Sequence, residues 1–439
     1  MSDERRHELL TSALEACRIE VLGRLQSAGL PFNVEIQMTK VIDQENGWRT
    51  EEETATVNAL HDPSVSIQIR DQSVSGIALG FGKELGPLAD HLVETTDLAD
   101  RPHPLMPPAK GATAVTARYL SRMVHHYLLS LSDLRQPDEQ LGASLREQLD
   151  ELCEQPPYRR VQEVAVAGVT ADSILTHRDI ALRPLTAHER GAAVGSHPFP
   201  VTLPGSEFVP PTRWDHFVPT ALLSITGDQK DMFFTDDGML AHRVALAFHL
   251  KGFELASSEV ISSFYWPRWS STGYSYGPFP LGEASNQDRQ MDREQFAEIV
   301  DLAFKMPALA GEEGSGEEIV LFRALRGLGT AHSEASFLDL AIALEAALLG
   351  GSQTELSYKF RLFGALFLRH ERSPEVTFDA LKTIYEARSK LVHGTKIRRQ
   401  ERMRATEMAR DLVKAIVLKA VEDGWPDPTE LTRIALSAP

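Results

Sequence analysis

The chain has 439 residues, of which 42% are hydrophobic and 24% are charged, and its formal net charge is −17 at pH 7. This length predicts two or three domains, and the composition is typical of a globular protein. The strong negative charge argues against a protein that coats nucleic acid without sequence preference. Any activity on nucleic acid would therefore depend on a local basic surface.

The sequence contains no sign of a membrane or secreted protein. No apolar run is long enough to cross a bilayer, and the first residues lack the hydrophobic segment of a signal peptide. The two cysteines, Cys17 and Cys153, are far apart and form no CxxC motif. They predict neither a zinc site nor a disulfide framework. We therefore expect a cytoplasmic protein without a membrane partner.

Hydrophobic periodicity predicts mixed structure in the first two thirds of the chain. The first helix begins near residue 3 and is ended by Gly29 and Pro31. The elements expected after it are strands over 33–42 and 64–82, a Pro-rich loop over 101–111, a helix over 112–134, two strands and a short helix over 159–195, mixed structure including 216–228, and a surface loop over 264–282.

From about residue 290 the pattern becomes helical. Two helices, over 292–306 and 317–332, precede four more over 333–350, 355–370, 373–394 and 400–424. The fold class expected is α+β, in which a mixed α/β N-terminal region is followed by an all-α bundle. The expected divisions are a sensing or regulatory region over 1–200, a linker or second subdomain over 201–290, and a helical domain over 291–439 with its core at about 333–423.

The helix predicted over 373–394 carries the most unusual pattern. Ser373 followed by Pro374 favours a helix start, and Gly394 favours a helix stop. Arg388 lies within the apolar stripe of this helix, and a buried guanidinium requires a carboxylate, carbonyl groups or an anionic ligand. The stripe expected to face the core consists of Phe378, Leu381, Ile384, Leu391 and Val392.

His393 follows Arg388 by five residues and would point well away from it in an ideal helix. Because it lies in the terminal turn next to Gly394, the helix end can tighten or unwind and redirect the ring. One interpretation is a functional site built at a helix end. The alternative is structural: Arg388 pairs with Glu345 or Glu355, and His393 caps the helix.

Spacing alone does not identify a site, because comparable Arg/His pairs occur elsewhere, for example Arg118/His125 and Arg243/His249. A basic run gives the motif further context. Residues 388–404 hold seven Lys or Arg side chains against the single acid Glu401. This run is either a local basic surface or an ordinary solvated helix face.

The region 333–423 resembles an ApeA-like HEPN domain, a four-helix module of prokaryotic defence and toxin systems. The resemblance rests on "ALEAALLG" in the first helix, "TELSYKFRLFGALFL" in the second and "IYEARSKLVHG" at the end of the third. The segment "RPLTAHE" upstream also resembles the N-terminal half of ApeA-type proteins.

The resemblance implies a metal-independent endoribonuclease without a cofactor, in which Arg388 and His393 are the catalytic residues. It implies a homodimer through the HEPN domain, with both Arg-x4-His motifs lining one cleft. It also implies an antiphage or abortive-infection role, with a phage-derived or nucleotide trigger expected at the N-terminal region. The supporting or RNA-binding residues expected are Ser389, Lys390, Glu345, Lys396, Arg398 and Arg399.

The residue types suit this chemistry. RNA cleavage without a metal uses the 2′-hydroxyl of the substrate. A histidine can accept its proton or protonate the leaving oxygen, and an arginine can hold the phosphate. Ser389 stands where the superfamily often has Asn, Asp or His, and its hydroxyl can still bond a phosphate oxygen. The other hypothesis is a catalytically silent HEPN module that binds RNA or a protein in a defence or regulatory complex.

Overall fold

The computed structural model describes most of the chain, and the structural statements below concern these residues only. The described residues are 2–437 without 45–46, 63, 66–81, 101–109, 155–158, 188, 191–218, 229–236, 267–287, 308–315, 330–332 and 351–354.

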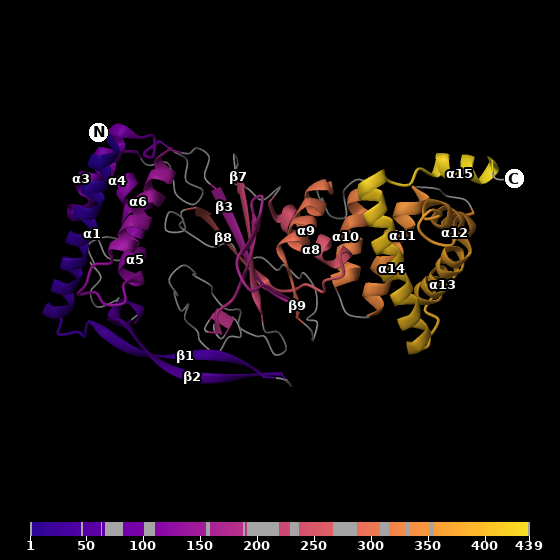
Figure 1. Cartoon of the computed structure of the whole chain (residues 1–439), viewed down its shortest axis with the longest axis horizontal. Helices are drawn as coiled ribbons and strands as arrows, with labels where there is room; N and C mark the ends of the chain where they lie inside the picture. Colours follow the sequence, from indigo (N-terminus) through magenta and orange to yellow (C-terminus); the bar gives the residue numbers. More distant parts are fainter. Residues whose placement is uncertain are drawn as a thin grey trace.

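The molecule is elongated, and its chain order follows its long axis (Figure 1). Helices from the N-terminal third form one end, a β-sheet occupies the middle, and the C-terminal helices form the other end. The two termini therefore lie far apart. This arrangement confirms the α+β class expected from the sequence.

The N-terminal helices enclose a hydrophobic core of their own, whose buried residues run from Leu10 to Leu152. Tyr119 and Leu92 are among its fully buried side chains. The helices are α1 (Ser2–Ser27), α3 (Gly82–Thr95), α4 (Ala112–Val115), the π-helical turn η2 (Thr116–Leu120), α5 (Ser121–Ser130) and α6 (Glu139–Glu154).

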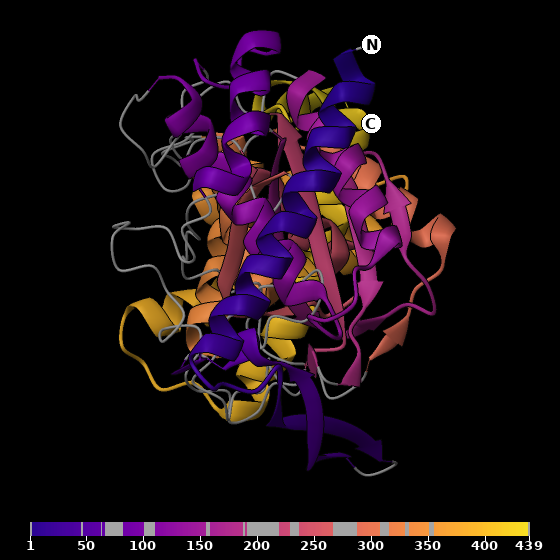
Figure 2. The same ribbon diagram turned by 90° about the vertical axis from the view of Figure 1, so that its left-hand side faces the viewer.

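A long antiparallel hairpin leaves this helical unit and projects from the body of the molecule (Figures 1 and 2). It consists of β1 (Asn33–Gln44), which confirms the strand expected over 33–42, and β2 (Gly47–Asn58). Buried Asn58 fixes its base, because the side-chain amide donates to the carbonyl oxygens of Leu128 and Leu131 at 3.0 and 2.5 Å. Most of the strand segment expected over 64–82 lies outside the described residues.

The central sheet has five antiparallel strands in the order β5-β6-β7-β3-β8. Alternating apolar residues place one face of β3 against the core, and Val164 and Val166 are fully buried there. The strands are β3 (Arg159–Ala167), β5 (Leu175–His177), β6 (Ile180–Pro184), β7 (Ala221–Asp228) and β8 (Ala256–Trp266), with a short parallel pair of β4 (Val169–Thr170) and β9 (Arg289–Gln290) beside them.

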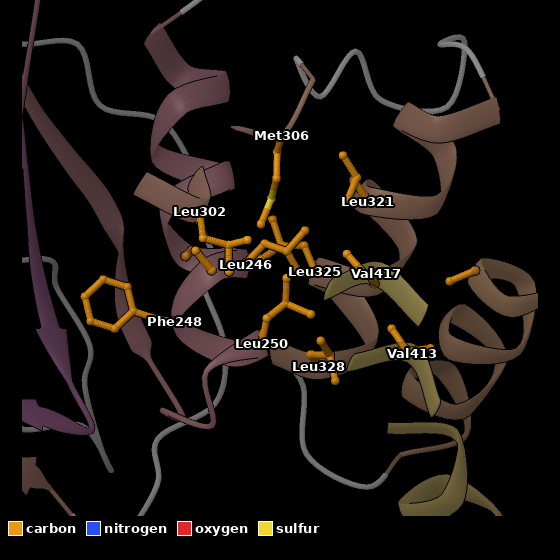
Figure 3. Packing of buried hydrophobic residues seen from close by; sticks show 14 of the residues in the cluster. Leu246, Phe248, Leu250, Leu302, Met306, Leu321, Leu325, Leu328, Val413 and Val417 are labelled. Carbon is orange, nitrogen blue, oxygen red and sulfur yellow. The ribbon is translucent and has the colours of Figure 1, made fainter. Parts of the chain in front are cut away.

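The C-terminal helices pack on one another and share a hydrophobic core with the central sheet. Figure 3 shows Leu246 and Leu250 next to Leu325 and Leu328, with Val413 and Val417 completing the contact from the far side. The helices are α8 (Asp237–Leu250), α9 (Arg293–Lys305), α10 (Gly316–Gly329), α11 (Glu334–Leu349), α12 (Leu356–Phe367), α13 (Pro374–Val392), α14 (Arg399–Asp423) and α15 (Pro428–Ser437).

One continuous core therefore joins the sheet to the helical bundle, with buried residues from Val164 to Leu431. The division between the two cores falls between Leu152 and Val164. Helices α8 and α10 lie between the sheet and α14, so the bundle shares its apolar interior with the sheet. The domain boundaries expected at residues 200 and 290 stay predictions.

Candidate functional site

Helix α13 begins and ends where the sequence predicts. The hydroxyl of Ser373 accepts a hydrogen bond from the Val376 backbone N–H, and Pro374 is the first helical residue. At the other end Gly394 adopts a left-handed conformation with φ of 70°. The backbone N–H of Thr395 donates to the Lys390 carbonyl at 2.8 Å, and that of Gly394 donates to Leu391 at 3.0 Å. These two bonds define a Schellman turn.

The apolar face of α13 is buried largely as predicted, with Leu381 and Ile384 fully covered. Leu391 packs against the core from a partly buried position. The prediction for Val392 is wrong, since this residue is 54% exposed. At about 100° per residue, Leu391 lies almost directly below Ile384, whereas Val392 lies about 80° away from Ile384 around the helix. Sequence spacing of three and four residues does not resolve this difference at a helix end.

Arg388 lies at the edge of this buried face. Its guanidinium approaches the Glu345 carboxylate on α11 at 3.3 Å, and the two side chains are 32% and 21% exposed. Burial raises the pKa of Glu345, and the nearby charge of Arg388 opposes this shift. The Nε atom of Arg388 is buried without a hydrogen-bond partner among the described residues. The guanidinium therefore retains an unused donor beside its carboxylate.

His393 occupies the C-cap position of α13 and is exposed. Its backbone N–H donates to the Ser389 carbonyl at 3.1 Å, while its ring forms no hydrogen bond or ion pair with a described residue. The helix remains regular up to Val392, so no unwinding turns the ring back. Five residues correspond to about 140° around a helix, and His393 therefore leaves α13 on a different side from Arg388.

The basic loop, which we define as residues 394–399, connects α13 to α14. Lys396, Arg398 and Arg399 are exposed, and none of their side chains forms a hydrogen bond or ion pair within the part of the chain that is described. The loop also lies next to the N-terminus of α14, where the helix dipole adds partial positive charge. The three cations therefore remain available to an anion.

Lys390 is not free to bind an anion as these three cations are, because its ammonium pairs with Glu401 at 2.7 Å. Arg402 likewise pairs with Glu334 at 2.6 Å. Glu401 follows Lys390 by eleven residues, and only the turn between α13 and α14 brings them together. The structure thus brings together Arg388 with Glu345 and Lys390 with Glu401.

In the upstream segment "RPLTAHE", the described residues Arg183, Thr186 and Glu189 are joined by side-chain hydrogen bonds. Arg183, at the end of β6, pairs with Glu189 through two hydrogen bonds of 2.8 and 3.0 Å. Thr186 and Glu189 exchange side-chain to backbone bonds of 2.9 and 3.1 Å, which is the geometry of a capping box. These bonds fix the exit of the chain from the sheet.

Comparisons with family models, with curated proteins and with solved structures give no match for this chain. Among the described helices, none has the length and apolar character to span a bilayer. Three or more His, Cys, Asp or Glu side chains are nowhere grouped as metal ligands within the described ranges.

Proposed function

We propose that the protein is a metal-independent HEPN-type endoribonuclease whose catalytic residues are Arg388 and His393. The observation that carries the proposal is the composition of the α13 terminus. An exposed histidine without a partner among the described residues lies next to the unpaired cations of the basic loop, and a partly exposed arginine lies one turn earlier. A chain with a net charge of −17 concentrates positive charge here, which favours an anionic substrate.

Each group has a definite part in the proposed reaction. The 2′-oxygen of the substrate attacks the adjacent phosphorus while the bond from phosphorus to the 5′-oxygen breaks. His393 accepts the 2′-hydroxyl proton or donates a proton to the departing 5′-oxygen. Arg388 stabilises the charge that develops on the phosphoryl oxygens. The products are a 2′,3′-cyclic phosphate and a 5′-hydroxyl, so atoms and charge balance without a further reactant.

Homodimerisation is part of the proposal because Arg388 and His393 of one chain diverge around α13. A two-fold axis beside the helix would place His393 of one protomer near Arg388 of its partner. Val392, which is 54% exposed and next to His393, is an apolar side chain that such a contact would cover.

Antiphage defence is the biological role proposed, and the resemblance of residues 333–423 supports it. The N-terminal helical unit, which has its own core, would receive the activating trigger.

A second function is favoured by one specific observation. The pair between Arg388 and Glu345 is the contact expected if Arg388 is structural and the module binds RNA or a protein without cleaving. The ribonuclease and the silent module differ in the part played by Arg388. In the ribonuclease, the phosphate of the substrate must compete with Glu345 for the Arg388 guanidinium, whereas in the silent module the Arg388–Glu345 pair stays intact.

The test uses the full chain and a 5′-labelled single-stranded RNA in buffer with excess EDTA. The proposal predicts cleavage that EDTA does not reduce, with a 2′,3′-cyclic phosphate at the new 3′ end of the labelled fragment. The matched substrate carries a 2′-deoxy nucleotide at the cleaved position and should remain intact, since its nucleophile is missing. Binding of RNA without cleavage would favour the silent module, and cleavage that needs added Mg²⁺ would contradict the proposal.

A further inference from the structure

A cavity lies in the N-terminal unit, where α1, α5 and α6 pack on one another (Figure 1). Its volume is about 270 Å³, which is the room that about nine water molecules occupy in the liquid. Residues of all three helices and of the chain that leads into α6 line it. Because the N-terminal unit has a core of its own, the cavity is separate from the α13 terminus and independent of the proposed function.

The pairing of α1 with α6 explains where the cavity forms. Arg6 of α1 binds Asp150 of α6, and the Arg146 guanidinium of α6 donates to the Thr11 hydroxyl of α1 at 3.1 Å. A step of five residues forward along α1 therefore matches a step of four residues back along α6, so the two helices run antiparallel. Thr11 and Arg146 both line the cavity, and their hydrogen bond joins the two helices there.

Gly142 provides the space of the cavity. It comes one turn before Arg146 on α6, and the antiparallel pairing places it opposite Leu14 and Glu15 of α1. Gly142 is buried, yet a Cβ atom added to it would meet no atom of the described residues within 4 Å. A glycine inside a helix is destabilising relative to alanine, and here no described neighbour requires one. The missing side chain leaves the hollow between the two helices open.

The inner wall of the cavity is apolar. It contains Leu14 and Tyr127, which are only 4% and 3% exposed. An apolar wall favours the hydrocarbon part of a ligand, and a tyrosine ring attracts a cation that lies over its face. The inner part of the cavity therefore suits an apolar chain that carries a positive charge.

The outer part of the lining has an excess of negative charge. The charged lining residues are the acids Glu15, Asp138 and Glu139 and the single base Arg146. Glu15 is bound by Arg18 at 2.6 Å, and Asp138 accepts a backbone hydrogen bond of 2.9 Å in the first turn of α6. Glu139 is exposed and makes no hydrogen bond or ion pair within the described part of the chain. One carboxylate at the cavity is therefore available to a cation.

We propose that this cavity is a binding site for a small organic cation, namely a primary amine or guanidinium group on a short apolar chain. The chain would lie against Leu14 and Tyr127 in the space that Gly142 leaves open, and the cationic group would bind Glu139. Glu15 would add to the attraction without losing its bond to arginine, because a carboxylate can accept several hydrogen bonds.

The probe is butylguanidinium, titrated into the full chain at constant ionic strength and followed by NMR of the ligand signals. We expect saturable binding, and about tenfold weaker binding of butylurea, which has the same shape without the charge. A blocked pentapeptide with one central arginine distinguishes two sources of the cation. Tighter binding of the peptide would assign the site to an arginine side chain of another protein, and tighter binding of butylguanidinium would assign it to a free small molecule. Equal binding of butylurea, or no saturable binding of either cation, would overturn the proposal.

Two substitutions test whether the cation binds in the cavity. Gly142→Leu fills the space, and its control is Gly23→Leu, at an exposed glycine of α1 where an added Cβ also meets no described atom within 4 Å. Glu139→Gln removes only the charge, and its control is Glu147→Gln, at an exposed glutamate of α6 outside the lining. Gly142→Leu and Glu139→Gln should each weaken binding about tenfold, while both controls bind like the wild type. Unchanged affinity of Glu139→Gln, an exposed position where the fold does not depend on the charge, would contradict the proposal.

Discussion

Two buried arginines of the N-terminal unit and the cations of the basic loop differ in whether they have partners. In the N-terminal unit, Arg6 is only 6% exposed and its guanidinium binds Asp150. Arg18 binds Glu15 at 2.6 Å and the Leu134 carbonyl at 2.8 Å. At the C-terminal end, the cations of the basic loop are exposed and have no partner among the described residues.

This difference separates structural cations from cations that are available for binding. A buried guanidinium whose donors are satisfied cannot turn to a substrate without loss of stability. An exposed cation without a partner contributes little to stability and can bind phosphate. Arg388 lies between these classes, because it has both a carboxylate neighbour and an unused Nε donor. Substitutions in each class can test this division.

Among the arginines, the largest effect is expected at Arg388. Arg388→Ala should reduce RNA cleavage by about 10²- to 10³-fold, since it removes the group proposed to stabilise the transition-state charge. The control is Arg433→Ala, at an exposed arginine of α15 that pairs only with nearby Glu430, and cleavage by this variant should equal that of the wild type. Undiminished cleavage by Arg388→Ala, measured with the labelled RNA, would place Arg388 among the structural cations.

At Arg6 we expect a loss of stability, because this arginine is buried and paired. Arg6→Ala leaves Asp150 with His7 as its remaining neighbour and should lower the free energy of unfolding by about 3 kcal/mol. Chemical denaturation measures this change, with Arg398→Ala as the matched variant from the basic loop. Arg398→Ala should change stability by less than about 0.5 kcal/mol. If both variants are equally stable, the comparison between the two ends fails.

The partly buried histidines His125 and His242 give a smaller, pH-dependent effect. Burial, assisted by Arg122 and His61, lowers the pKa of His125 from 6.5 to about 4. Because the folded-state pKa is the lower one, the unfolded chain binds the proton more readily, and stability falls as the pH drops below 6.5 towards 4. When the pH is lowered from 7 to 5, the contribution of His125 should reduce the free energy of unfolding by about 2 kcal/mol.

Thermal unfolding of wild type and His125→Gln across that pH range measures this cost. The variant should lose less stability on acidification than the wild type. His242 in the second core provides the comparison, since burial also lowers its pKa to about 4. Parallel profiles of stability against pH for the wild type and His125→Gln would show that folding does not lower the pKa of His125.

The smallest effects are expected at single residues of the basic loop. Lys396→Ala and Arg399→Ala should each weaken RNA binding by about 1 kcal/mol or less, because each removes one exposed cation that can bind a phosphate. The slope of log affinity against log salt should become shallower by about 0.7 for each phosphate of a single strand that is no longer neutralised. Fluorescence anisotropy at several salt concentrations measures both quantities. An unchanged slope would mean that the loop does not bind the backbone of RNA.

Local sequence signals predicted helix α13 well. Its start and stop depend on Ser373, Pro374 and Gly394, whose effects are confined to neighbouring residues, and all three act as predicted. The choice between Glu345 and Glu355 as the neighbour of Arg388 could not be made from the sequence. It depends on how α11 and α12 pack against α13, and the structure selects Glu345.

Long-range features were harder to predict for the same reason. Strand β2 contains Glu51, Glu52 and Glu53, residues that disfavour a strand, and its pairing with β1 overrides this preference. The shared core of sheet and bundle depends on α8, which meets α10 and α14 from distant parts of the chain.

The central claim is that His393 transfers a proton during RNA cleavage. The most direct test compares the wild type, His393→Ala and His370→Ala on the same RNA in excess EDTA. His370 is an exposed histidine shortly after α12, so His370→Ala is a control with the same chemical change as His393→Ala. His393→Ala should lose about 10²- to 10⁴-fold in rate, while His370→Ala should cleave like the wild type. Cleavage by a folded His393→Ala chain at the wild-type rate would contradict it.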